Sequence, residues 1–168
     1  MAVDHARELR SEIGNTEDPI DTNTLFDLLG IASSATDQWE PVVRSSVSVG
    51  VPTGDQRIKF IPRKKHPIGK RFELSRYVGD LIHTGIDQWL VNTDLGTSRQ
   101  KYQRAFAAEF LCPINGLIKF LEGDFSDEAI EDAVEHFNVS EQTITSLLAS
   151  NHYIEYQSIN EMPYHIGF

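Results

Sequence analysis

The stretch RFELSRYVGDLIH, residues 71 to 83, has the residue spacing of an α-helix with one apolar face. Its apolar side chains recur at i, i+4, i+7 and i+8, the spacing of one helix side. These side chains are Leu74, Val78, Leu81 and Ile82. Ionisable residues gather on another side, at Glu73, Arg76, Asp80 and His83. We therefore expect a helix that buries its apolar face and groups its ionisable side chains on a second face.

The chain before this helix is predicted to form two helices and a hairpin. One helix covers residues 2 to 13, and a second covers residues 22 to 29, where Asp21 or Thr22 can act as the cap and Gly30 ends the helix. Residues 42–51 and 57–62 alternate between apolar and polar side chains, and PTGDQ supplies a turn between them. We expect a hairpin at about 42–62 in a small antiparallel sheet, followed by a loop at 63–70.

The chain after residues 71–83 is predicted to be almost entirely helical. A polar loop, NTDLGTS, precedes a helix at about 98–111, which Pro113 ends or kinks. Shorter helices follow at about 114–121, at 126–137 with Ser126 as the cap, and at 140–149 with Ser140 as the cap. HYIEYQSI, which begins at residue 152, has the pattern of a short strand, and residues 161–168 are expected to form a loose tail.

Taken together, these elements predict a mainly helical α+β fold with a small antiparallel sheet and a C-terminal helical pair. The length of 168 residues and the hydrophobic content of 40 % suit one domain that spans residues 1–168. No run approaches 18 consecutive apolar residues, so we expect no membrane segment. Cys112 is the single cysteine, which excludes an intramolecular disulfide and a zinc–thiolate cluster. We interpret Cys112 as a small core residue and the protein as cytoplasmic.

The net charge of -10 is distributed unevenly along the chain. Residues 109–168 hold 11 acidic residues and a single basic one, Lys119. Residues 57–76 hold 8 Lys and Arg residues, opposed only by Glu73. Such a separation of acidic and basic residues is typical of a surface that attracts a charged partner. It is equally typical of a face that is simply solvated.

Three blocks of residues occur in an order that resembles the ImmA/IrrE-type metallopeptidase family. The blocks are RFELSRYVGDLIH at 71–83, AFAAEFLCP at 105–113 and FNVS at 137–140, and the resemblance covers roughly residues 20 to 150. It implies a zincin-like fold with a peptidase-like core at about 20–125. It also implies that residues 126–150 form a scaffold pair similar to a helix-turn-helix.

Active members of the family carry two zinc-binding histidines and a glutamate base on the first helix, and a third ligand on the second helix. In this chain, the resemblance places the first histidine at Arg76, the base at Tyr77, the second histidine at Asp80 and the third ligand at Tyr102. A permanently charged guanidinium cannot bind a cation, and a tyrosine with a pKa of about 10 is a poor base near neutral pH. Because all four positions are altered, we expect a pseudoenzyme with no catalytic residue, no bound metal and no cofactor.

The substituted residues suggest how the former site is filled. Arg76 and Asp80 stand at i and i+4, so they can pair directly across one helical turn. Tyr77 and Tyr102 can close the remaining space as packing residues, with ligand contact as the alternative. A relocated metal site remains a further alternative, with ligands drawn from Asp80, His83, Glu73 and Glu109.

The segment AIEDAVEHFNVSEQTITSLLASN, residues 129–151, resembles a helix-turn-helix. A DNA-reading second helix would need basic or amide side chains within a basic surface. Here the second helix has no Lys or Arg, and the first helix is acidic. We therefore interpret this pair as a scaffold.

These observations predict a catalytically inactive metallopeptidase-like protein that acts by binding another protein. The resemblance implies a helix-turn-helix regulator, or a host or phage defence component, as the partner, and an unpaired strand at the hairpin edge as the contact. The alternatives are nucleic-acid or phosphate binding through residues 57–76, and a metal-dependent peptidase with relocated ligands. A homo-oligomer is left open. The candidate binding residues are Arg76, Tyr77, Asp80, Tyr102, Arg104, Arg63, Lys64 and Lys65.

Overall fold

The computed structural model describes residues 1–32, 34, 46–53, 57–85 and 88–155. Within these ranges the chain forms seven helices and a three-stranded antiparallel sheet, so the α+β class and the predominance of helix are confirmed. The helices are α1 (Ala2–Glu12), α2 (Thr22–Leu29), α3 (Pro67–Thr84), α4 (Ser98–Leu111), α5 (Ile114–Leu121), α6 (Asp127–Phe137) and α7 (Glu141–Ser150). The strands are β1 (Ser48–Thr53), β2 (Arg57–Ile61) and β3 (Leu90–Asn92).

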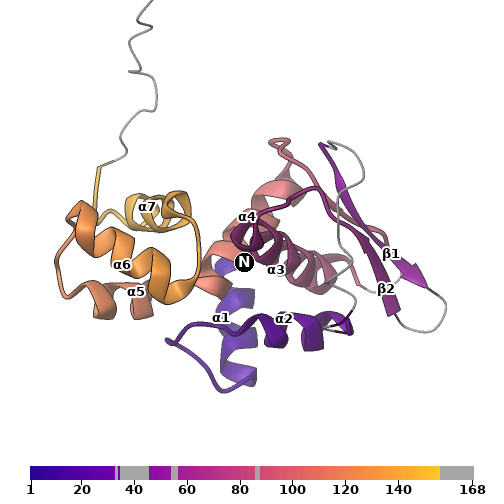
Figure 1. The fold of residues 1–168 in the computed structure, drawn as a ribbon, viewed down its shortest axis with the longest axis horizontal. Coiled ribbons are helices and arrows are strands. Elements are labelled where there is room, and N and C mark those ends of the chain that lie inside the picture. Colours follow the sequence, from indigo (N-terminus) through magenta and orange to yellow (C-terminus); the bar gives the residue numbers. More distant parts are fainter. Residues whose placement is uncertain (33, 35–45, 54–56, 86–87, 156–168) are drawn as a thin grey trace, which may run out of the picture.

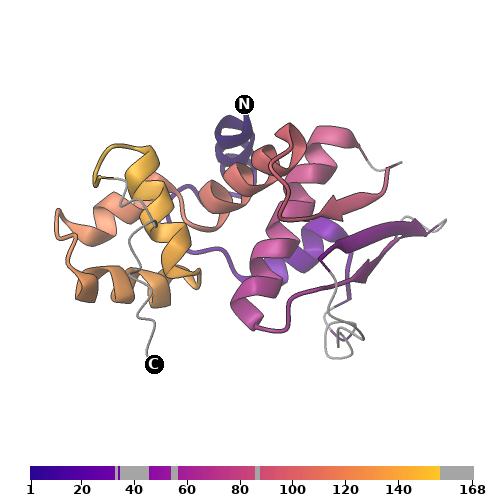
Figure 2. The same ribbon diagram turned by 90° about the horizontal axis from the view of Figure 1, so that it is seen from above.

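The sheet lies at one end of the molecule and α5–α7 lie at the other, with α3 and α4 between them (Figures 1 and 2). Helices α1 and α2 lie against this central pair, where α1 packs on α4 and α2 packs on α3. Helix α5 lies with α6 and α7 in both views. The core runs through the whole arrangement, from Phe60 on the sheet through Phe106 on α4 to Leu148 on α7.

The strand order is β2-β1-β3, which places β1 in the centre. The predicted hairpin is present, but its first strand begins at Ser48 and continues through the predicted turn residues Pro52 and Thr53. A proline is tolerated at this position because β3 begins at Leu90, opposite Gly50, so β1 has only one neighbouring strand at Pro52. Residues 42–45 and 54–56 lie outside the described residues. Strand β3 was not predicted, because three residues are too few to show a periodic pattern.

The inner face of the sheet is built around a glycine. Gly50 on β1 lies opposite Phe60 on β2 and opposite Leu90 on β3, and both large side chains are buried. A Cβ atom at Gly50 would lie 3.0 Å from the Phe60 ring and 3.2 Å from Leu90 Cβ. The absence of a side chain at Gly50 therefore lets Phe60 and Leu90 converge over the central strand.

Helix α3 is longer and more deeply buried than its sequence indicated. It begins at Pro67, inside the predicted loop 63–70, because proline suits the first helical position and His66 Nδ1 caps the Ile68 amide. Leu74 and Val78 are buried as predicted, but Ile82 is exposed. Glu73, Arg76 and Asp80, which were assigned to a second face, are also buried because α4 and β3 cover that face: Glu73 4 %, Arg76 2 % and Asp80 0 % exposed.

Buried arginines attach α1 and α2 to the rest of the molecule. Arg10 on α1 is 1 % exposed and donates hydrogen bonds to the backbone oxygens of Thr16, Asp18 and Phe110. Arg71 on α3 donates to Thr22 Oγ1 and to the Ile20 carbonyl at the start of α2. Guanidinium groups therefore satisfy backbone carbonyls that the loop 13–21 would otherwise bury without partners.

The C-terminal helices agree closely with the sequence prediction. Ser126 Oγ and Ser140 Oγ cap the amides of Ala129 and Thr143, and Asn138 adopts a left-handed conformation that joins α6 to α7. Cys112 is fully buried, as expected of a core residue. Residues 152–155 do not form the predicted strand, and the rest of that segment and the predicted tail at 161–168 lie outside the described residues. Within the described helices, none has the length and apolarity needed to span a membrane.

We expect Gly79→Ala to lower the free energy of unfolding by about 2 kcal/mol through overpacking. The added methyl group would lie 2.7 Å from Cγ and Cδ1 of Phe106, where α3 and α4 cross. Gly69→Ala on the same helix is the matched control, because its methyl group would meet only the Lys64 side chain at 3.3 Å. Urea denaturation of both variants measures the difference, and equal stability of the two would show that the crossing is not tightly packed.

Candidate functional site

Arg76 is a buried cation that acts as a hydrogen-bond donor within the fold. Its Nη2 atom donates to the Thr93 carbonyl at 2.8 Å, to Gln103 Oε1 at 3.1 Å and to Gln100 Oε1. Its Nε atom is buried and has no hydrogen-bond partner among the described residues. Burial, reinforced by the nearby charges of Arg63 and Arg104, lowers the pKa of Arg76 to about 10, so the group stays charged at neutral pH.

Asp80 is fully buried and forms a bidentate ion pair with Arg99. Arg99 Nε lies 2.7 Å from Oδ1, and Arg99 Nη2 lies 2.6 Å from Oδ2. The hydrogen bonds to Asp80 raise the pKa of Arg99. Arg76 and Asp80, which the i, i+4 spacing allowed to pair, therefore do not pair with each other. The two side chains leave α3 on the same face, but α4 presents Arg99 to the carboxylate and glutamines to the guanidinium, so each finds its partner on the neighbouring helix.

Both side chains belong to a larger network along the outer edge of β3. Alternate residues of a strand direct their backbone groups to opposite edges, and β3 pairs with β1 on its other side. At the outer edge, Arg99 donates to the Trp89 carbonyl, the Val91 amide donates to Asp80, and the Thr93 amide donates to Gln100 Oε1. The Val91 carbonyl accepts from Nε2 of Gln100 at 2.9 Å and of Gln103 at 3.0 Å, and the Thr93 carbonyl accepts from Arg76.

Five side chains of α3 and α4 thus occupy the positions that an added strand would fill. We call them the edge network: Arg76, Asp80, Arg99, Gln100 and Gln103. A peptide could pair with β3 only by displacing them, and the other edge of the hairpin's first strand is already paired with β3. We therefore do not expect peptide addition at the edge of β3. Strand β2 of the hairpin forms the other edge of the sheet, and peptide addition there stays a prediction.

Tyr77 and Tyr102, which the resemblance places at the base and third-ligand positions, lie in the hydrophobic core. Tyr77 is 2 % exposed and packs its ring against Phe60 at a centroid distance of 4.7 Å. Burial raises the pKa of Tyr77, and its hydroxyl, close to Ser48, has no well-formed hydrogen bond to a described residue. The Tyr102 hydroxyl lies 2.6 Å from His5 Nδ1, and its ring stacks on His83 at 4.5 Å. Burial and the charge of Asp80 raise the pKa of Tyr102.

The residues at the positions that the resemblance assigns to zinc ligands do not fit a zinc ion. Arg76 is a cation, both carboxylate oxygens of Asp80 accept from Arg99, and the Tyr102 hydroxyl is bonded to His5. Zinc needs at least three nitrogen, sulfur or oxygen ligands that are free to converge on it. Across the residues that the structure describes, no group of three or more His, Cys, Asp or Glu side chains is arranged to hold a metal ion.

The side chains proposed for a relocated metal site also interact with other residues. Glu73 pairs with Arg63 at 2.5 Å. Glu109 pairs with Arg7 at 2.8 Å and accepts from the Ile114 amide at the start of α5. His83 lies against Tyr102.

The basic segment, residues 57–76, contains both ion-paired and exposed cations. The Arg63 side chain is 3 % exposed and is neutralised by Glu73 and by Asp94, whose oxygens lie 2.7 and 2.9 Å from its Nη atoms. The hydrogen bonds from Arg63 lower the pKa of Asp94. Lys64 and Lys65 are exposed. Arg104 on α4 donates to the Leu95 carbonyl and has no carboxylate partner among the described residues.

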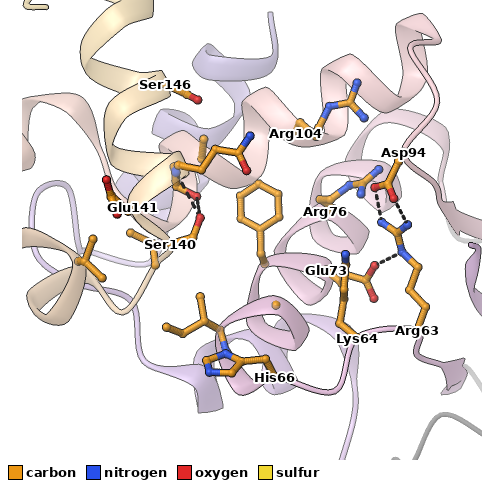
Figure 3. Close-up of a pocket in the computed structure, with 18 residues that line it drawn as sticks. Arg63, Lys64, His66, Glu73, Arg76, Asp94, Arg104, Ser140, Glu141 and Ser146 are labelled. Carbon is orange, nitrogen blue, oxygen red and sulfur yellow. Dashed lines mark hydrogen bonds and ion pairs between the residues drawn. The ribbon is translucent and has the colours of Figure 1, made fainter. Parts of the chain in front are cut away.

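A pocket of about 740 Å³ lies between α3, α4 and α7. Arg63, Lys64, Arg76 and Arg104 line it, so the structure brings together four of the eight candidate binding residues. Figure 3 shows Arg63, Arg76 and Arg104 on one side of the pocket and Ser140, Glu141 and Ser146 on the opposite side. Lys65, Tyr77, Asp80 and Tyr102 do not line it.

Sequence reasoning missed Gln100, Gln103 and Asp94. One signal was present, because Gln103 stands at the i, i+3, i+7 spacing of Phe106 and Phe110 and is therefore a polar residue within an apolar stripe. Such a residue is buried with a specific hydrogen-bond partner or not buried at all. The partner, the edge of β3, could not be anticipated without the strand.

We expect Asp80→Ala and Gln100→Ala to expose different amides of β3 to hydrogen exchange. Asp80→Ala removes the acceptor of the Val91 amide, and Gln100→Ala removes the acceptor of the Thr93 amide, which lies 2.8 Å from Oε1. Each change should speed exchange of its own amide at least about 10-fold, beyond the change in global stability. Asp80→Ala should also cost about 2 kcal/mol of unfolding free energy, below the range for fully buried pairs because Arg99 is partly exposed. Equal effects on both amides would contradict the edge network.

Comparison of the chain with protein-family models, with curated proteins and with solved structures found no match. The relation to the ImmA/IrrE-type metallopeptidases and the zincin-like fold therefore remain predictions from residue patterns. In the structure, side chains of α3 and α4 hold the edge of β3, beside a pocket to which Arg63, Lys64, Arg76 and Arg104 contribute.

Proposed function

We propose that the protein is a catalytically inactive, metallopeptidase-like domain that acts by binding another protein. The observation that carries this proposal is the edge network, in which residues at the former ligand positions hold the backbone of β3. A hydrolytic site needs a bound metal or an activated nucleophile, together with a base that reaches it. Arg76, Asp80 and Tyr102 are all committed to protein partners, and the hydroxyl at the base position, Tyr77, is buried with a raised pKa.

A binding role is supported by an apolar row on the outer face of the sheet, a face that also carries the exposed Lys59 opposite Val51. Val49 on β1 lies opposite Ile61 on β2 and Val91 on β3, which forms one apolar row across all three strands. Ile61 is 54 % exposed, and Trp89, the residue directly before β3, is 62 % exposed. Exposed apolar surface with a tryptophan is typical of protein–protein contacts, where tryptophan often carries much of the binding energy.

The family resemblance supports a particular class of partner. Active relatives cut helix-turn-helix regulators, so an inactive relative would hold such a regulator, or a host or phage defence component, without cleaving it. The outer sheet face is separate from the edge network, so a partner can bind there without displacing any side chain that holds β3.

We expect the purified protein to bind less than about a tenth of an equivalent of zinc when zinc is offered, because the described residues offer no free ligand set. Native mass spectrometry and metal analysis measure the stoichiometry. Asp80→Ala is the control and should leave the zinc content unchanged. Binding of one equivalent of zinc that is lost in Asp80→Ala, together with zinc-dependent peptide cleavage, would contradict the proposal of an inactive domain.

We expect Trp89→Ala to weaken partner binding roughly 30-fold, the effect of losing a typical hot-spot residue. Leu95→Ala is the matched control, since Leu95 is 63 % exposed but lies in the loop after β3. The partner is first captured by crosslinking in cells, then purified, and its Kd is measured by calorimetry for the wild type and both variants. If Leu95→Ala weakens binding as much as Trp89→Ala, the outer sheet face is not the contact.

A further inference from the structure

We infer that the pocket between α3, α4 and α7 is a binding site for a small organic phosphate. This site lies away from the outer sheet face and does not depend on the proposed protein contact. Its volume of about 740 Å³ lies within the range of small-molecule sites. The inference rests on the charges that line the pocket, on their partners, and on the apolar surface beside them.

Arg76 provides the first argument, because it is a nearly buried cation on the pocket wall. It is 2 % exposed, its Nε atom has no hydrogen-bond partner among the described residues, and none of their carboxylates forms an ion pair with it. Burial and the nearby charges of Arg63 and Arg104 lower its pKa, and the charges of Glu73 and Asp94 counter this by less. A buried charge without a directly paired counter-ion is costly, and an anion in the pocket would reduce that cost.

Arg104 and Lys64 provide the second argument, because they line the same pocket without carboxylate partners in the described chain. With Arg76 they approach from three places: Lys64 from the segment before α3, Arg76 from α3, and Arg104 from α4 (Figure 3). A phosphate presents oxygens in several directions, whereas a carboxylate presents two in one plane, so donors from three elements favour phosphate. The guanidinium groups add the fork geometry suited to phosphate oxygens.

The remaining charges limit how many anionic groups the pocket can take. Arg63 is already neutralised by Glu73 and Asp94, and Glu141 lies on the opposite wall. Four cations therefore face three carboxylates, which favours one phosphoryl group over a polyphosphate. The adjacent α6 is acidic along its exposed side, which would repel the backbone of a nucleic acid.

The other lining residues indicate the body of the ligand. Ile68, Phe72, Val134 and Val139 contribute apolar surface to the pocket, while Ser140 and Thr143 contribute hydroxyl groups. A site that combines apolar surface with a few placed polar groups suits an organic ligand better than an inorganic ion. The assigned ligand is accordingly a phosphate monoester with an apolar or aromatic body.

Calorimetric titration with phenyl phosphate at 150 mM salt tests the assignment. Four comparison probes test other ligands. Inorganic phosphate tests the free ion, and benzoate tests a carboxylate. Phenol tests the neutral body of the ligand, and a short DNA duplex tests a nucleic acid. The protein variants are Lys64→Gln and Arg104→Gln. Their matched controls are Lys65→Gln and Lys101→Gln, which remove the same charge from neighbouring exposed positions outside the pocket. Arg76 is left unchanged because it also holds β3.

We expect saturable 1:1 binding of phenyl phosphate, tighter than binding of every comparison probe. Lys64→Gln and Arg104→Gln should each weaken it about 10-fold, the loss of one charge-assisted hydrogen bond, while both controls bind like the wild type. Absence of saturation below about 10 mM would overturn the assignment. So would equal weakening by the controls, which indicates unspecific attraction, and so would preferred binding of benzoate, inorganic phosphate or the duplex.

Discussion

The structure depends on the burial of a polar helix between a sheet and a second helix. Helix α3 carries Glu73, Arg76 and Asp80 into the interior, where each ionised group must find a partner or destabilise the fold. The partners come from α4, from the segment before α3, and from the backbone of β3. The position of β3 and the packing of α3 on α4 therefore both serve to provide partners for these buried groups.

The same constraint connects the fold to the proposed loss of catalysis. In the family that the chain resembles, three metal ligands would converge from α3 and α4, whereas here side chains of these helices diverge to hold the edge of a strand. Six buried polar atoms without partners among the described residues all lie on α3 or on strands β1 and β3: Ser48 Oγ, Arg71 Nε, Ser75 Oγ, Arg76 Nε, Tyr77 OH and Asn92 Oδ1. The centre of the domain is therefore polar, and side chains of the edge network hold the backbone of β3 there.

The two candidate binding surfaces differ in chemistry because they lie against different parts of α3. The sheet covers one side of the helix and turns an apolar row outward, with Ile61, Val49 and Val91 as its members. The pocket lies between α3, α4 and α7. Its lining includes several cations, and the acidic C-terminal helices do not neutralise them. A protein contact on the sheet and a phosphate in the pocket can therefore coexist.

The sequence by itself determined the elements whose signals are local. The spacing of apolar residues and the caps Asp21, Ser126 and Ser140 located the helices, and alternation located the hairpin. The departures from the pattern of the family that the chain resembles, at Arg76, Tyr77, Asp80 and Tyr102, could likewise be read directly. Only the tertiary structure decided which charges pair, because hydrogen-bond partners depend on which helices pack together. Strand β3, the Asp80–Arg99 pair and the cation-lined pocket arise from contacts between segments that are distant in the chain, and no local pattern encodes such contacts.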